Sequence, residues 1–372
     1  MSNLFDPISL GPLALSNRIA ISPMCQYSSV DGNATDWHMA HLGSLALSGA
    51  GLLILEATAV TTEGRITPGC VGLWNDENEA ALDRVLKMLR AVSPTRIAIQ
   101  LAHAGRKASS ARPWEGGALL DIDQGGWETI APSAVPHIDN ERPPRAMSHD
   151  DLTRIRDAFV DAARRAVRLG VDAIELHGAH GYLLHQFLSP IANRRDDDYG
   201  GSLENRMRFP LEVFDAVRAA VPDSVAVGMR VSATDWYDAG PSWDLEQTIA
   251  FARALKERGA DWIDVSSGGV TPLQKITVGP GYQVPFAQAV KAQSGLATMA
   301  VGMITEAQQA QDIIASGKAD MVALGRAILY DPRWPWHAAA QLGAKLEGPR
   351  QYWRSLPSGT HRIFGDTAHG QR

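Results

Sequence analysis

Two histidines and a tyrosine follow one apolar segment at close spacing. The stretch "VDAIELHGAHGYLLHQFLSP", residues 171–190, begins as an apolar run and continues directly to His177, His180 and Tyr182. Imidazole and phenol groups donate and accept protons, and imidazole also binds metals. The spacing therefore points to hydrogen-bonding, acid–base or metal chemistry at the end of this segment.

Seven other apolar segments also carry, within or just after their later residues, side chains that could take part in a site. The residues concerned are Ser22, Pro23, Met24, Cys25 and Tyr27 at the first, Ala57 at the second, Gln100, His103 and Lys107 at the third, Arg230 at the fifth, Ser266 and Ser267 at the sixth, Gly302 at the seventh, and Gly325 and Arg326 at the eighth. In a parallel barrel the carboxyl ends of all strands meet at one face, where active sites lie.

The eight segments have the composition of strands that are buried on both faces. They are residues 18–25, 51–60, 96–105, 171–178, 224–232, 260–268, 296–303 and 319–328. Amphipathic stretches separate most of them; the clearest is 151–169, with Ser148 as a predicted cap and Gly170 as a predicted stop. The pattern predicts a (β/α)8 TIM barrel, with an open doubly wound sheet as the alternative.

Two regions depart from this pattern. Residues 107–147, after the third segment, are rich in Pro, Gly and Trp, and Trp114 and Trp127 favour an ordered, packed loop. Residues 331–372 are expected to form a C-terminal extension, whose last part, 358–372, is too polar to pack well. The chain is thus expected to be a single domain over residues 1–372.

Composition limits the partners and the compartment. The apolar fraction is 45%, the charged fraction 20% and the net charge −6, which suits a buried globular enzyme and disfavours nucleic-acid or membrane-surface partners. No signal peptide precedes the first segment, and Cys25 and Cys70 form no CxxC pair. We therefore expect a cytoplasmic protein without disulfides.

Glycines after the seventh and eighth segments suggest a phosphate site. Gly302 and Gly325 would offer backbone N–H groups, and Arg326 would add a positive charge. The alternative is that both glycines only permit tight turns.

A zinc site is the alternative interpretation of the two histidines. No carboxylate or cysteine stands at metal spacing beside His177 and His180, and the glycines of "HGAHGY" disfavour a helix there. We therefore expect no metal.

The absence of other nucleotide motifs narrows the choice of cofactor. No G-x-G-x-x-G follows a strand, no G-x-x-x-x-G-K-[ST] is present, and no lysine stands beside a pyridinium partner. Flavin mononucleotide (FMN) fits best, with its phosphate at the seventh and eighth strands and its ring beside Gln100 and Arg230.

Six motifs carry a resemblance to a known family. They are "NRIAISPMCQYS", "EATAVTTEGRI", "QLAHAGRKAS", "HGAHGYLLHQFLSPIANRRDDDYGGSLENRMRF", "MRVSATD" and "VGMITEAQQAQDIIASGKADMVALGRAIL". From about Leu4 to Arg354 the chain resembles the Old Yellow Enzyme family of FMN-dependent ene-reductases, within its bacterial xenobiotic-reductase-like branch.

The resemblance implies a role for each matched position. Flavin contacts are expected from Ser22, Pro23, Met24, Cys25, Ala57, Gln100, Arg230, Gly302, Gly325 and Arg326. His177 and His180 would donate hydrogen bonds to the substrate carbonyl oxygen, Tyr182 would supply the proton, and Tyr27 would shape the pocket.

The resemblance also implies the reaction and the assembly. NADPH or NADH would reduce FMN, which would then pass hydride to the β carbon of an activated alkene in a ping-pong mechanism. A homodimer, or a homotetramer of dimers, is expected. Trp353 or Arg354 of one subunit would reach the neighbouring active site, and Arg354 is taken as a substrate-binding residue.

Three other functions compete with this interpretation. A barrel that isomerises or cleaves a sugar phosphate would explain Gly302, Gly325 and Arg326 but leave His177 and Tyr182 without a role. A non-catalytic flavin-binding role has no supporting residue. Dienoyl-type reductases carry an iron–sulfur cluster, which two isolated cysteines cannot hold.

Overall fold

A closed barrel of eight parallel strands forms the centre of the computed structural model, which describes residues 3–365. The barrel closes because β12 pairs with β3 in parallel, Val322 opposite Ile19. Each predicted segment contains one barrel strand, so the predicted TIM barrel is confirmed. The strands are β3 (Ile19–Ile21), β4 (Leu52–Ala59), β5 (Arg96–Ala102), β8 (Ala173–Gly178), β9 (Ala226–Ser232), β10 (Trp262–Ser266), β11 (Ala297–Val301) and β12 (Met321–Leu324).

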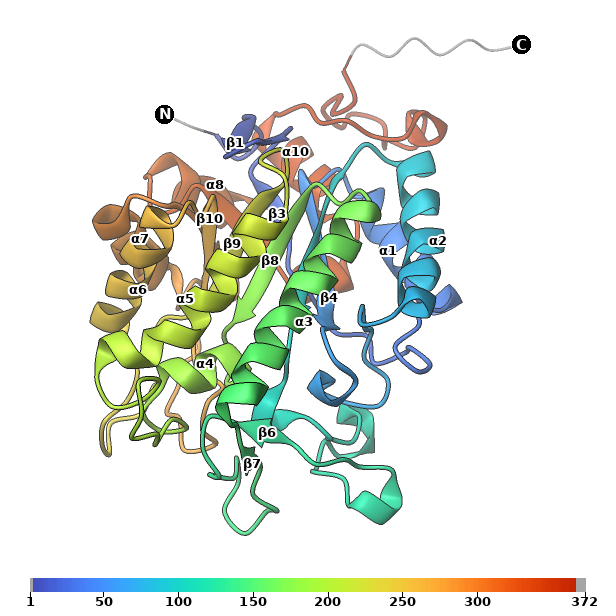
Figure 1. Ribbon diagram of the computed structural model, residues 1–372. Helices are drawn as coiled ribbons and strands as arrows, with labels where there is room; N and C mark the ends of the chain where they lie inside the picture. Colours follow the sequence, from blue (N-terminus) through green and yellow to red (C-terminus); the bar gives the residue numbers. More distant parts are fainter. Residues whose placement is uncertain (1–2, 366–372) are drawn as a thin grey trace.

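Helices pack around the outside of the barrel (Figure 1). The predicted helix is α3, and its cap is confirmed, because the Ser148 hydroxyl accepts a hydrogen bond from the Asp151 N–H at 3.2 Å. Gly170 follows with φ +69° and ends the helix. The helices are α1 (Asp36–Ala46), α2 (Asp76–Val92), α3 (His149–Arg168), α4 (Leu183–Leu188), α5 (Leu203–Ala220), α6 (Leu245–Glu257), α7 (Val284–Ser294), α8 (Ala307–Ala315), α9 (Arg326–Tyr330) and α10 (Trp334–Leu342).

The barrel interior consists of layers because alternate residues of each strand point inward. Near the strand starts the layer is apolar and includes Ala98, Ala173 and Trp262. A hairpin of β1 (Ile8–Leu10) and β2 (Leu13–Leu15), absent from the sequence-based prediction, adds its leucines to this layer. The hairpin therefore closes the amino-terminal end of the barrel.

The loop after β5 is ordered, as predicted, but its two tryptophans differ. It contains the short strands β6 (Ile130–Ala131) and β7 (Arg145–Ala146) and lies at the carboxyl end of the barrel (Figure 1). Trp127 packs inward, and its indole N–H donates to the Glu63 carbonyl at 2.9 Å. Trp114 is 66% exposed and meets Tyr27 edge-on at 5.9 Å, so it adds less to the packing of the loop than Trp127 does.

The C-terminal extension folds back to the amino-terminal end of the barrel (Figure 1). The stretch 358–372 was expected to pack poorly; within its described part, 358–365, residues 358, 359, 361 and 362 are exposed, but the expectation was wrong for Ile363 and Phe364. Ile363 is 1% exposed and Phe364 lies edge-on to Trp336 at 5.0 Å, so two apolar side chains anchor an otherwise polar stretch. The rest of that stretch, 366–372, lies outside the described residues.

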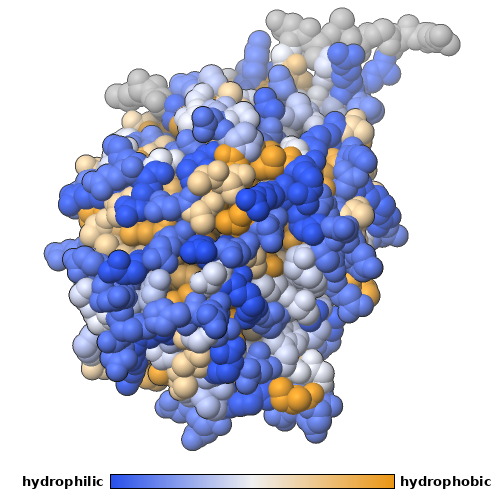
Figure 2. Space-filling model, in the orientation of Figure 1, coloured by the Kyte–Doolittle hydropathy of each residue, from blue (hydrophilic) through white to orange (hydrophobic). Residues whose placement is uncertain are grey.

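The surface in Figure 2 is mainly hydrophilic, with apolar patches between the polar side chains. Among residues 3–365, no helix is both long and apolar enough to cross a bilayer.

The hairpin leads to a first prediction. Leu13 is 4% exposed and packs in the inner apolar layer, so Leu13→Ala should lower the free energy of unfolding by about 2–5 kcal/mol. Ala14 lies on the exposed side of β2, and Ala14→Ser should cost less than about 0.5 kcal/mol. Urea unfolding of both variants checks this; equal costs would show that the hairpin does not seal the barrel.

Candidate active site

The His–His–Tyr group gathers at the carboxyl end of β8. His177 is the penultimate residue of the strand, and Tyr182 caps α4. The ring centres of His177 and His180 lie 5.2 Å apart, and those of His177 and Tyr182 lie 4.9 Å apart. Sequence reasoning placed these residues together, and the structure brings all three into one cluster.

Each histidine has one ring nitrogen engaged with the protein. His177 Nδ1 accepts from the Ala179 N–H at 3.3 Å, and His180 Nε2 lies 2.7 Å from the Ser266 hydroxyl. Burial, with the Arg230 charge as the next cause, holds the pKa of both imidazoles well below the ordinary value. Both rings are therefore neutral at pH 7. His177 carries its proton on Nε2. The single proton of the Ser266 hydroxyl can go to His180 Nε2 or to Gln283 Oε1, 3.4 Å away, and the first arrangement leaves the His180 proton on Nδ1.

The phenol of Tyr182 stays protonated. Burial raises the pKa of Tyr182 well above its ordinary value. The Lys107 ammonium lies 5.1 Å from the centre of the Tyr182 ring and donates to the carbonyls of His180 and Gly269. Burial, and the neighbouring Arg106, lower the pKa of Lys107 to about 8, so it remains a cation at neutral pH.

A buried pair that sequence reasoning missed holds the turn between His180 and Tyr182. His185 Nδ1 accepts from the Gly181 N–H at 2.9 Å, and His185 Nε2 lies 3.0 Å from Asp235 Oδ1. Both side chains are fully buried, and Ser189 donates to the same carboxylate at 2.6 Å. His185 lies three residues after Tyr182 in the apolar run, where it carried no distinctive signal.

Residues 22–25 follow β3 at the same end of the barrel. The Ser22 hydroxyl is buried and has no hydrogen-bond partner among the described residues. Burial, followed by the neighbouring Cys70 and Glu56, raises the pKa of the Cys25 thiol well above its ordinary value. Pro23 and Met24 are half-buried, and Ala57 on β4 is buried. The Gln26 N–H donates to Glu56 at 2.9 Å and fixes this segment against β4.

Gln100 and Arg230 point into the barrel from β5 and β9. Each lies beside a buried carboxylate of the adjacent strand that sequence reasoning missed. The Gln100 amide donates to Glu175 Oε1 at 2.8 Å, and Arg230 Nε lies 3.0 Å from Asp264 Oδ2. The signal was present in the sequence as single acidic residues at inward positions of otherwise apolar strands.

The predicted phosphate residues lie on two adjacent strand ends. Gly302 follows β11 with φ +119°, where a Cβ would come 2.7 Å from Gln283 Nε2, and Met303 follows with φ +48°. Gly325 immediately precedes α9, and a Cβ there would lie 3.9 Å from Met24 Sδ, its nearest neighbour. Packing against protein therefore demands a glycine at 302 but not at 325. Arg326 begins α9 and is exposed.

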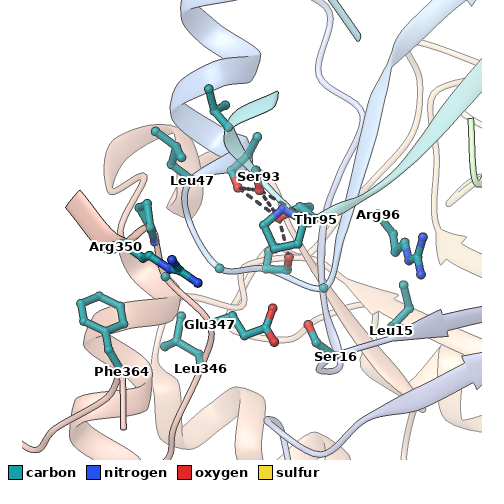
Figure 3. Close-up of a pocket in the computed structure, with 18 of the residues that line it drawn as sticks. Leu15, Ser16, Leu47, Ser93, Thr95, Arg96, Leu346, Glu347, Arg350 and Phe364 are labelled. Atoms are coloured by element: carbon teal, nitrogen blue, oxygen red, sulfur yellow. Dashed lines mark hydrogen bonds between the residues drawn. The ribbon is translucent and has the colours of Figure 1, made fainter. Parts of the chain in front are cut away.

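Tyr27 and Arg354 lie at opposite ends of the molecule. Tyr27 is half-buried and edge-on to Trp114 at 5.9 Å in the loop region. Trp353, next to Arg354, lines a cavity of about 750 Å³ at the amino-terminal end of the barrel (Figure 3). The expectation for Arg354 concerns a neighbouring subunit and stays a prediction.

The cavity in Figure 3 does not resemble a reaction site. Its hydrogen bonds run from Ser93 and Thr95 to the carbonyls of Ala46 and Ala50, so they join the ends of structural elements. Within residues 3–365, no three His, Cys, Asp or Glu side chains are grouped to hold a metal ion.

The family model for the NADH:flavin oxidoreductase / NADH oxidase family matches residues 3–345. The chain belongs to this family. Its relatives include an NADPH dehydrogenase of Geobacillus sp. (strain WCH70), 44% identical over 353 residues that cover 94% of this chain and 98% of the relative. Another is an NADPH dehydrogenase of Bacillus licheniformis, 45% identical over 359 residues, with 95% and 100% covered.

Solved structures agree with this assignment to the flavin oxidoreductase family. A morphinone reductase in complex with tetrahydroNAD is 29% identical, with a TM-score of 0.74, and the match covers 94% of this chain and 93% of that chain. Together these matches place the chain in the Old Yellow Enzyme group. It is an FMN-dependent oxidoreductase with a nicotinamide nucleotide as reductant.

The residues at the carboxyl end of the barrel fit FMN. The unpartnered Ser22 hydroxyl, the glycines at two adjacent strand ends and the exposed Arg326 supply donors and charge. The buried Arg230 cation supplies positive charge inside the barrel.

A glycine substitution tests the geometry of the β8–α4 turn. Gly181 has φ +73°, and a Cβ there would overlap the Gly269 carbonyl. Gly201 has φ +78° with nothing within 4 Å, so it is a matched control. Both alanine variants carry the same backbone strain, and Gly181→Ala should lose about 1–3 kcal/mol more unfolding free energy. If denaturant unfolding shows equal losses, the turn is not tightly packed.

Proposed function

We propose that this enzyme reduces the carbon–carbon double bond of alkenes that are conjugated to a carbonyl or nitro group. The observation that carries the proposal is the pair of neutral imidazoles, ring centres 5.2 Å apart, at the carboxyl end of β8. Bound FMN would supply the hydride chemistry, with NADPH or NADH as the hydride source and the β carbon of the alkene as the acceptor. Substrate and nucleotide use one pocket in turn, so the kinetics are ping-pong.

His177 and His180 act as the substrate clamp. The proposal assigns the Ser266 hydroxyl proton to His180 Nε2, and the Ala179 N–H donates to His177 Nδ1. His177 Nε2–H and His180 Nδ1–H are then the donors left for ligand. Negative charge develops on the substrate oxygen as the β carbon accepts hydride. Two preplaced N–H donors stabilise that charge more than they stabilise the ground state, as an oxyanion hole does.

Tyr182 is the proton donor to the α carbon. Its raised pKa keeps the proton on the phenol until the substrate carbon becomes basic. Lys107, 5.1 Å from the ring centre, stabilises the phenolate that remains. Tyr27 shapes the pocket beside the long loop.

The remaining assignments follow the same proposal. Residues 22–25 and Ala57 would line the flavin, Gln100 and Arg230 would contact its ring, and Gly302, Gly325 and Arg326 would hold its phosphate. The chain would act as one FMN-binding domain in a homodimer or a homotetramer of dimers. Arg354 or Trp353 would then enter the neighbouring site, since both lie far from the clamp within one chain.

The clamp is tested by removing both donors. His177→Ala with His180→Ala should slow cyclohexenone reduction by at least ~100-fold, because the developing oxyanion loses its donors. FMN should stay bound, as its absorbance would show. His149 is exposed, and His149→Ala should leave turnover unchanged. Normal turnover of the double variant would contradict the clamp.

A second variant separates the two half-reactions. Tyr182→Phe removes the proton that the α carbon needs, so the alkene half-reaction should slow by ~100-fold or more. Flavin reduction by NADPH needs no phenol proton and should keep its rate. Stopped-flow absorbance measures both steps. If both half-reactions slowed equally, or if neither slowed, Tyr182 would not be the acid.

A further inference from the structure

Two carboxylates are buried inside the barrel next to the side chains that we place at the flavin ring. Glu175 and Asp264 are both 0% exposed. Glu175 accepts from the Gln100 amide at 2.8 Å, and Asp264 lies 3.0 Å from Arg230 as an ion pair. The strand register sets both contacts, since Gln100 is opposite Glu175 and Asp264 is opposite Arg230.

The cluster contains one positive charge for two carboxyl groups. Arg230 is its cation, and the Trp262 indole N–H approaches Glu175 Oε2 at 3.5 Å. An uncompensated charge inside a protein costs several kcal/mol, so two ionised carboxylates with one guanidinium are unfavourable here.

The neighbouring elements do not supply a second positive charge that could neutralise the second carboxylate. Towards the strand starts the interior layer is apolar, with Ile54 of β4, Met299 of β11 and Ala323 of β12. Towards the strand ends His177 is neutral, and Glu56 of β4 faces His38 and the backbone instead. The cluster must therefore hold one proton at neutral pH.

Glu175 is the group that holds this proton. Burial raises the pKa of both acids, but Asp264 lies 3.0 Å from the Arg230 cation, which opposes that rise, whereas Glu175 has only neutral donors in contact. Burial, with the Asp264 charge as the next cause, raises the pKa of Glu175 to about 8.

We propose that Glu175 and Asp264 are positioning residues for the flavin ring, Asp264 orienting Arg230 and partly offsetting its charge, and Glu175 holding Gln100 and one proton. The inference rests on the proposed placement of Gln100 and Arg230 at the ring. The Gln100 amide nitrogen uses one of its two N–H donors on Glu175, so the Gln100 oxygen and the second N–H remain to face the ring. Arg230 keeps its terminal nitrogens for the ring edge where reduction places negative charge.

The midpoint potential of bound FMN, measured from pH 6 to 10, tests this arrangement. Asp264→Asn removes the charge that offsets Arg230, so the reduction equilibrium should shift at least tenfold towards reduced flavin, about +30 mV for a two-electron couple. Asp261→Asn makes the same change just before β10, where Asp261 accepts from the Val227 N–H, and should leave the potential unchanged. An unchanged potential in Asp264→Asn would overturn the role of Asp264.

Glu175→Gln replaces a neutral acid with a neutral amide of the same shape. The midpoint potential of FMN bound to this variant should equal the wild-type value at pH 7. Above about pH 8 the wild-type potential should fall more steeply with pH than that of the variant, because Glu175 ionises. In the infrared, the wild-type protein should show a protonated-carboxyl band at pH 7 that Glu175→Gln lacks. Identical pH profiles, or the same band in both proteins, would overturn the role of Glu175.

These measurements separate the two proposals. The infrared band and the potentials do not require alkene turnover. If the wild-type enzyme did not reduce alkenes, the proposed function would be wrong, but the midpoint potentials could still be interpreted. Normal alkene reduction with unshifted potentials would defeat only the positioning roles.

Discussion

The short turn from β8 to α4 is the constraint on which the site depends. Within six residues it must carry His177, His180 and Tyr182 from inside the barrel to its rim, and His180 adopts a φ of +58° to do so. The Gly181 N–H is held by His185, which is itself held by the fully buried Asp235. Because Asp235 follows β9, the neighbouring strand fixes the turn as firmly as β8 does.

The layers inside the barrel explain why the site is polar and yet buried. The hairpin leucines and Trp262 fill the amino-terminal end, which excludes water from below. The next layer holds the Gln100–Glu175 and Arg230–Asp264 contacts, and the imidazoles lie above it. Burial keeps those imidazoles neutral, and neutral rings can each present one N–H without attracting anions non-specifically.

The barrel and most of the residues of the proposed site could be predicted from the sequence. Strands buried on both faces have a continuous apolar signal, and His177, His180 and Tyr182 stood out because they follow such a strand directly. Contacts between distant residues gave no comparable signal: Asp235 is 50 residues from His185, and their pairing exists only in the fold. The three-residue hairpin strands were too short to show a period, and Ile363 and Phe364 were hidden in a polar run.

The central claim is that two neutral imidazoles present His177 Nε2–H and His180 Nδ1–H to one substrate oxygen. Nitrogen-15 NMR of the histidine side chains, assigned with single His→Gln variants, reads the protonation of each ring nitrogen directly. At pH 7 we expect one protonated nitrogen on each ring, Nε2 for His177 and Nδ1 for His180, with both signals shifted when a phenol binds. A doubly protonated ring, or the opposite tautomer at either histidine, would contradict the account.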